Sequence, residues 1–215
     1  MRRTPLLACL LLLAAAPAAA DRDLRTDRTE IAVTGATRVH IEVPVGEVEV
    51  RSVRGDTLRT SMTVRCGNLS RRCRERAEPI RLQTRREGST LVLDVAGFPR
   101  STSNGSPSVR LAVMLPERLG LQVELGVGEA TIRDVAADVR LEVGVGEARV
   151  RVPREAVRSV SIEVGVGEAD LRPKPPRTSR AGFLFLGNDV RWDDGPGHAS
   201  VDIEVGVGEG RVELE

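Results

Sequence analysis

A seven-residue motif that ends in Val-Gly-Glu recurs five times in this chain, and it constrains the fold more than any other feature. The copies span residues 41–47, 123–129, 141–147, 162–168 and 203–209. Their closing glutamates lie 82, 18, 21 and 41 residues apart, close to multiples of about 20 residues. Repeats of this length predict stacked structural units. We therefore expect eroded copies of the unit between residues 47 and 129, and a degenerate copy at 186–188.

The apolar residues change from odd to even positions, or the reverse, at the end of each copy. Leu141, Val143 and Val145 occupy odd positions, whereas Ala148 and Val150 occupy even ones. Alternation with a period of two indicates a half-buried strand, and a change of parity at glycine indicates a bend that keeps apolar side chains inward. The predicted corner of each unit is a Gly-Glu pair: Gly46 and Glu47, Gly128 and Glu129, Gly146 and Glu147, Gly167 and Glu168, and Gly208 and Glu209.

This pattern predicts an all-β, single-domain β-solenoid of about 20-residue turns with Gly-Glu corners. The alternative is a β-sandwich of hairpins, which also has alternating strands. Aromatic residues make up 2% of the chain, so the core must be built from Val, Ile and Leu. We expect a signal peptide at 1–20, an N-terminal lead-in segment at 21–38 and the repetitive domain at 39–215.

The N-terminus has the three parts of a secretory signal peptide: basic Arg2 and Arg3, an apolar run at 6–16, and small residues at 18–20. Cleavage before Asp21 would export the protein to the periplasm or the extracellular space. The apolar run is too short for a transmembrane segment. Cys9 stands in a sequence that resembles a lipidation box, but it follows the basic start too closely to favour lipidation. Cys66 and Cys73 are predicted to form a disulfide in this oxidising compartment.

Two further segments carry structural expectations. Residues 71–76 are predicted to be a charged loop near the cysteines. The chain stops within a strand pattern at 211–215, which predicts an uncovered sheet edge there and makes self-association plausible.

Stacking would place Glu129, Glu147, Glu168 and Glu209 in one column, where like charges need compensation. Basic residues follow these glutamates, among them Arg149, Arg172 and Arg211, so a solvated salt-bridge lattice is the favoured interpretation. Divalent-cation binding by the column is the alternative. No metal ligand set and no cofactor motif is predicted.

A carbohydrate-active β-helix enzyme would need two carboxylates in different environments. Asp193, Asp194 and His198 are the one local acid–histidine group, and their Gly/Pro-rich surroundings favour a turn. Nucleic-acid binding is not expected, because 32 Lys and Arg balance 31 Asp and Glu and no basic patch results.

The segments at 39–50 and 109–116, followed by the repeats, resemble the bacterial "putative adhesin" domain family of unknown function. Relatives of that family include auto-transporter adhesin head domains and toast-rack domains. The resemblance covers roughly residues 30–214 and implies a stacked β-fold in exported proteins, without catalytic residues. The expected function is a non-catalytic interaction or scaffolding module in the cell envelope. The expected partner is an envelope protein, a polysaccharide or a second copy of the chain.

Overall fold

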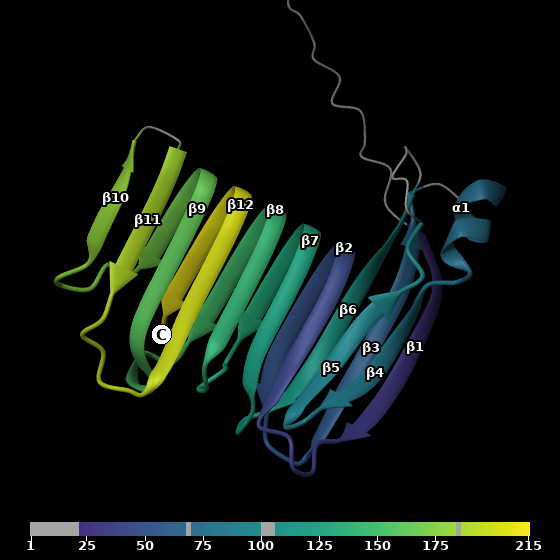
Figure 1. The fold of residues 1–215 in the computed structure, drawn as a ribbon, viewed down its shortest axis with the longest axis horizontal. Helices are drawn as coiled ribbons and strands as arrows, with labels where there is room; N and C mark the ends of the chain where they lie inside the picture. Colours follow the sequence, from purple (N-terminus) through teal and green to yellow (C-terminus); the bar gives the residue numbers. More distant parts are fainter. Residues whose placement is uncertain (1–21, 68–69, 100–105, 184–185) are drawn as a thin grey trace, which may run out of the picture.

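The structure is a computed structural model that describes residues 22–67, 70–99, 106–183 and 186–215. The predicted signal peptide and Cys9 lie outside the described residues. The described part forms a 12-stranded sheet with one short α-helix (Figure 1), which confirms the predicted all-β class. The elements are β1 (Arg22–Ala32), β2 (Arg38–Val53), β3 (Thr57–Cys66), α1 (Arg71–Ala77), β4 (Arg81–Glu87), β5 (Thr90–Ala96), β6 (Pro107–Pro116), β7 (Gly120–Arg133), β8 (Val139–Val152), a 3-10 turn (Arg154–Ala156), β9 (Val157–Arg172), β10 (Ser179–Phe183), β11 (Leu186–Trp192) and β12 (Ala199–Leu214).

The five motif copies lie on five long strands that are neighbours in one open sheet. The sheet order is β1-β3-β6-β2-β7-β8-β12-β9-β11-β10; off this path, β5 pairs with β2, and β4 pairs with β5. The five strands β2, β7, β8, β12 and β9 pair in parallel, and equivalent motif residues face one another across every pair. Gly146, for example, pairs with Gly128 on one side and with Gly208 on the other.

The stacking order differs from the order that the sequence spacing predicts. Glu47 pairs directly with Glu129, so no eroded units separate them. Strands β5 and β6, from this intervening segment, pair in parallel with the first and second halves of β2, as one eroded unit would, but they do so on the side of β2 away from β7. The same segment contains α1, β3 and β4; β3 pairs antiparallel with β6, and β4 with β5. The predicted copy at 186–188 lies in β11, which pairs antiparallel with β9. The distances between motif copies in the sequence did not predict the stacking order. Strands pair where their backbone shapes match, and a segment of any length between two copies can lie outside the stack.

Each long strand is bent at its motif, and its two halves pack on one another. In β8, Val143 is buried before the bend, and Ala148 and Val150 are buried after it. A methyl group added at Gly210, in the second half of β12, would lie 2.8 Å from Cγ2 of Ile162 in the first half of β9. The core therefore fills the space between two layers of one folded sheet, a sandwich-like arrangement (Figure 1).

The valine before the second motif glycine points to solvent, which corrects the expectation that it lies in the core. Val127, Val145, Val166 and Val207 are 43–48% exposed. The parity of the strand changes across the whole Gly-Val-Gly segment instead of at Gly146 and Glu147 alone. The reason is geometric, because the middle residue of a bend faces the convex side of the sheet.

Residues 71–76 belong to α1 instead of the predicted loop. The hydroxyl of Ser70 accepts a hydrogen bond from the Cys73 amide at 3.2 Å and caps the helix. The predicted disulfide between Cys66 and Cys73 is present, and it joins the end of β3 to this helix.

The C-terminal strand lies inside the sheet, so the predicted uncovered edge at 211–215 is wrong. β12 pairs with β8 on one side and β9 on the other, and the Glu215 carbonyl accepts a hydrogen bond from the Arg154 amide at 2.9 Å. The ends of the sheet path are β1 and β10. Most charged side chains of β1 are exposed, with Arg25 half-buried, and exposed charges discourage pairing of an edge strand with another chain.

Candidate interaction surface

The closing glutamates of the motif form one row on the second halves of the long strands. Glu47, Glu129, Glu147, Glu209 and Glu168 follow one another in register. Arginines bind most of this row, as the predicted salt-bridge lattice requires. Arg149 pairs with Glu147 and lies 3.8 Å from Glu129, and Arg211 pairs with Glu209. The pairs involve exposed or half-exposed side chains, so each stabilises the fold by about 0–1 kcal/mol.

Glu47 shows how this lattice affects ionisation. Partial burial alone would raise the pKa of Glu47, but the hydrogen bonds from Arg110 and Arg65 and their positive charges outweigh burial and lower it. The two guanidinium groups approach the carboxylate to 2.6 Å and 2.7 Å. The ionised form of Glu47 is therefore the one that the folded state favours.

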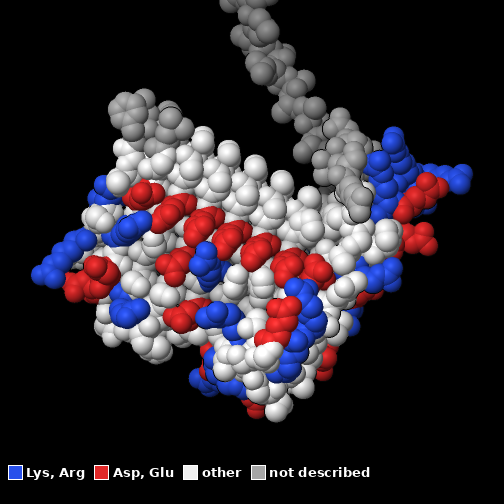
Figure 2. Space-filling model, viewed as in Figure 1, with Lys and Arg blue, Asp and Glu red and all other residues white. Residues whose placement is uncertain are grey.

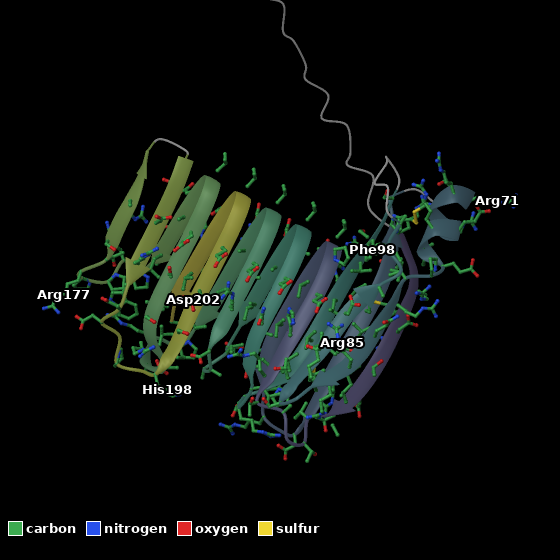
Figure 3. All side chains as sticks on the ribbon, in the orientation of Figure 1. Arg71, Arg85, Phe98, Arg177, His198 and Asp202 are labelled. Carbon is green, nitrogen blue, oxygen red and sulfur yellow. A yellow bond between two sulfur atoms is a disulfide. The ribbon has the colours of Figure 1, made fainter. Side chains whose placement is uncertain are left out.

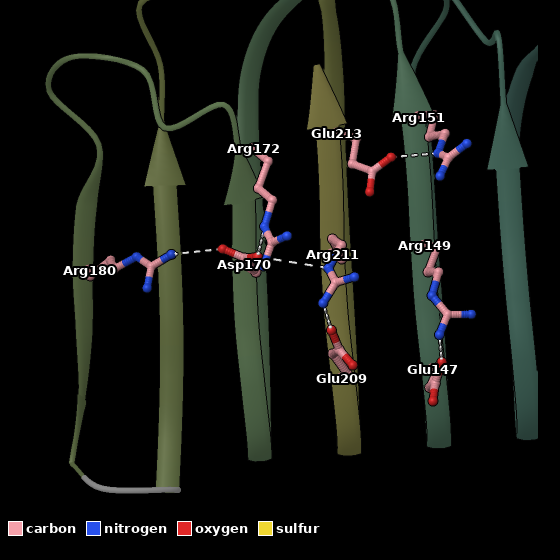
Figure 4. Close-up of polar contacts among 9 residues, drawn as sticks. All are labelled: Glu147, Arg149, Arg151, Asp170, Arg172, Arg180, Glu209, Arg211 and Glu213. Carbon is pink, nitrogen blue, oxygen red and sulfur yellow. Dashed lines mark hydrogen bonds and ion pairs between the residues drawn. The ribbon is translucent and has the colours of Figure 1, made fainter. Parts of the chain in front are cut away.

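Asp170 is the most buried carboxylate of this face and connects three strands (Figure 4). It accepts hydrogen bonds from Arg172 on its own strand and from Arg180 of β10, and Arg211 of β12 lies 3.8 Å away. The Asp170 carboxylate offsets the repulsion among the three guanidinium groups. The network therefore stabilises the fold, and the carboxylate of Asp170 is fully engaged in it.

A second row of carboxylates crosses the first halves of the strands, and it borders a groove of about 730 Å³. We call these seven residues the carboxylate row; in spatial order they are Asp94, Glu42, Glu124, Glu142, Glu204, Glu163 and Asp189. Each pairs in register with the next one, on strands β5, β2, β7, β8, β12, β9 and β11. Figure 2 shows an acidic row across this face, which also carries Asp202 in Figure 3.

On the side of the bend, the groove is lined mostly by the first glycine of each motif copy. In β2 this position is occupied by Pro44. The backbone itself requires these glycines. A methyl group at Gly144 would lie 2.6 Å from the Gly126 carbonyl oxygen, and one at Gly165 would lie 2.7 Å from that of Gly206. The shape of the groove thus follows from the close approach of the bent strands, and the carboxylates supply its chemical character.

The chain partly neutralises the carboxylate row from the side away from the bend. Arg140 lies 2.7 Å from Glu142 and 3.3 Å from Glu204, on the neighbouring strand. These contacts raise the pKa of Arg140, through the hydrogen bond to Glu142 first and the charges of both acids next. Arg85 and Arg191 make similar contacts with Glu42 and Glu163, at 3.1 Å and 2.6 Å.

His40 also contributes, with Nε2 2.9 Å from Glu124 and Nδ1 3.6 Å from Glu42. Among the described residues that line the groove itself, none is Lys or Arg. The row is therefore screened on one side, and its other side faces the open groove.

Sequence analysis overlooked this row although its signal was present. Five of the seven acids stand at the second position of each motif copy, the position of Glu42. The predicted corner instead used the closing glutamate, which marks the change of parity. Asp94 and Asp189 carry no motif and join the row only through pairing of β5 and β11 with the stack.

The acid–histidine group of the sequence lies in the segment between β11 and β12, as the predicted turn requires. Asp194 pairs with Arg177 at 3.0 Å, and the His198 amide donates to the Ala156 carbonyl. Asp193 borders a smaller pocket of about 280 Å³ with Asp202. Partial burial raises the pKa of Asp202 while the charge of Arg140 lowers it, and burial dominates.

Within the described ranges, no group of three or more His, Cys, Asp or Glu side chains is arranged to hold a metal ion. No α-helix in the described part of the chain has the length and apolar character to cross a membrane.

Comparison with known proteins yields a likeness of fold. No protein-family model and no curated protein matches the chain. The crystal structure of a "putative cell adhesion protein" from Clostridium sporogenes matches with a TM-score of 0.54 and 15% sequence identity, over 90% of this chain and 100% of that one.

Two crystal structures described as "putative adhesin" align with lower scores. The one from Bacteroides fragilis has a TM-score of 0.26 and 8% identity, over 88% of this chain and 97% of that one. The one from Parabacteroides distasonis has a TM-score of 0.27 and 10% identity, over 89% and 97%. This chain thus shares its fold with a "putative cell adhesion protein", which supports at the level of fold the resemblance drawn from its sequence.

Proposed function

We propose that this chain is an exported, non-catalytic, adhesin-like module that binds a partner in the bacterial cell envelope. The carboxylate row beside the groove is the observation that supports this most directly. It repeats one chemical group at one position on adjacent strands, as binding to an extended partner requires. A hydrolytic site instead needs two carboxylates whose environments differ.

Export is supported by the predicted signal peptide and by the disulfide, which is typical of oxidising compartments. The adhesin-like character is supported by the fold shared with the protein from Clostridium sporogenes. We propose further that the stack of five bent strands is a short β-solenoid. The connection from β7 to β8 returns the chain to the start of the next strand in register, as one turn of such a coil does.

Binding to purified envelope components tests this function. The mature chain is immobilised and exposed separately to cell-wall polysaccharide and to envelope proteins, and binding and release of reducing sugar ends are both measured. Saturable binding that soluble chain competes away, without bond cleavage, is the expected result. Release of sugar ends would overturn the non-catalytic assignment, and absence of saturable binding to every component would overturn the binding function.

A further inference from the structure

We propose that the groove binds an extended basic polypeptide, whose guanidinium or ammonium groups lie along the carboxylate row. This inference rests on the proposed binding function and names the partner of the same surface. Three observations support it: the charge of the groove, the spacing of the row, and the ion pairs that the chain's own arginines make with these acids.

The charge of the surface selects a cationic partner. Three guanidinium groups, those of Arg85, Arg140 and Arg191, contact five of the seven carboxylates of the row. With His40 counted as neutral, seven negative and three positive charges leave the row with a net charge of −4. A neutral polymer lying in the groove would remove water from these carboxylates without replacing it by an opposite charge, which is costly.

The spacing of the row suits an extended peptide. Adjacent strands are about 4.8 Å apart, so seven carboxylates in register extend over about 29 Å. An extended chain advances about 3.4 Å per residue, and eight or nine residues span this length. Alternate side chains point to one face, so such a peptide can present about four cations to the row, which matches its net charge of −4.

The chain itself shows that guanidinium groups fit between neighbouring acids of the row. Arg140 reaches Glu142 on its own strand and Glu204 on the next one. Arg85 likewise lies 3.1 Å from Glu42 and 3.9 Å from Asp94. These arginines approach from the side away from the bend. A bound peptide would approach the same carboxylates from the groove and repeat the same charge-assisted contacts.

A divalent cation is a poorer match for the same acids. Calcium takes six to eight oxygen ligands that converge on one point. The acids of the row lie one per strand along a line, and no described group of three converges.

The test measures binding of a nine-residue peptide with Arg at alternate positions and Gly between, by calorimetry and by fluorescence anisotropy. A peptide with Glu in place of Arg is the probe control. The groove variant is Glu124→Gln/Glu142→Gln/Glu204→Gln. The matched control variant is Glu129→Gln/Glu147→Gln/Glu209→Gln, which removes the same charge from the same three strands on the second halves.

We expect the basic peptide to bind the unmodified chain and the acidic peptide not to bind. Binding of the basic peptide should weaken at least tenfold in the groove variant and less than about twofold in the control variant. Equal weakening in both variants would reveal general charge attraction and overturn the inference. Circular dichroism and thermal melting establish that each variant is folded. If the groove triple variant does not fold, Glu204→Gln alone is compared with Glu209→Gln, and the groove substitution must weaken binding more.

Failure of this inference is distinguishable from failure of the proposed function. If the peptide does not bind but envelope components do, the groove assignment is wrong and the binding function stands. Polysaccharide binding that is lost only in the groove variant would overturn the polypeptide class of partner. Calcium binding that is lost only in the groove variant, with no peptide binding, would overturn it in favour of a cation.

Discussion

The replacement Gly146→Ala tests the physical basis of the bend most severely. Gly146 has a φ angle of +140°, a region that L side chains avoid and that costs an alanine about 1–3 kcal/mol. A methyl group there would lie 1.8 Å from the Gly128 carbonyl oxygen on β7. Backbone cannot yield as a flexible side chain does, so β7 and β8 must separate until this distance reaches the 3.4 Å of an ordinary contact.

Separation at the bend would break two or three of the hydrogen bonds that join β7 and β8, at a net cost of about 1 kcal/mol each. Together with the backbone strain, the free energy of unfolding should fall by about 3–6 kcal/mol, a large share of the 5–15 kcal/mol typical of a domain. Gly55→Ala is the matched control. Gly55 has a φ angle of +125° and nothing within 4 Å of an added methyl group, so this variant measures strain alone.

Urea unfolding followed by circular dichroism gives the free energy for both variants. Gly146→Ala should lose at least 2 kcal/mol more than Gly55→Ala, or fail to fold, by the bond losses counted above. Equal losses in the two variants would show that the approach of neighbouring strands is not what requires glycine at the bend.

Three further outcomes are expected. Val143 is 3% exposed and Val145 is 48% exposed, so Val143→Thr should cost about 1–2 kcal/mol in a urea melt and Val145→Thr less than about 0.5 kcal/mol; a larger cost at Val145 would contradict its exposed position. Replacing Cys66 and Cys73 by Ala opens a short loop and should lower the free energy of unfolding by about 2–3 kcal/mol, as should reduction of the unmodified chain; no change on reduction would contradict a stabilising disulfide. The pKa of Glu47 is lowered in the folded state, so its stabilisation is present above the ordinary value of 4.5 and is lost as pH falls through the lowered pKa. Glu47→Gln should therefore cost up to about 1 kcal/mol at pH 7 and progressively less as the pH falls below 4.5, and a cost that does not change with pH would refute this ionisation.

The sequence was a reliable guide wherever a local rule decides the structure. Alternation around Gly146 predicted two half-buried strand segments that meet at a bend, and the burial of β8 has this form. The disulfide between Cys66 and Cys73 was predicted from their proximity in a chain expected to be exported, and it is present. Both rules depend on a few neighbouring residues, so no knowledge of distant pairing was needed.

The two main failures have different causes. Residues 71–76 were expected to form a loop, but the Ser70 cap and the disulfide stabilise a helix there. Distance along the chain was taken as distance along the stack, yet Glu47 and Glu129 are direct neighbours. Sequence spacing does not reveal whether an intervening segment stacks or is looped out.

The sequence by itself determined the unit of this protein: a strand of alternating apolar residues, bent where glycine permits φ angles that other residues avoid. Only the tertiary structure decided how the units are ordered. The insertion of β12 between β8 and β9 brings Glu204 beside Glu142 and Glu163, and pairing of β5 and β11 adds Asp94 and Asp189. The physical reason is that backbone hydrogen bonds between strands carry no record of residue number, so the continuous carboxylate row exists only in the folded sheet.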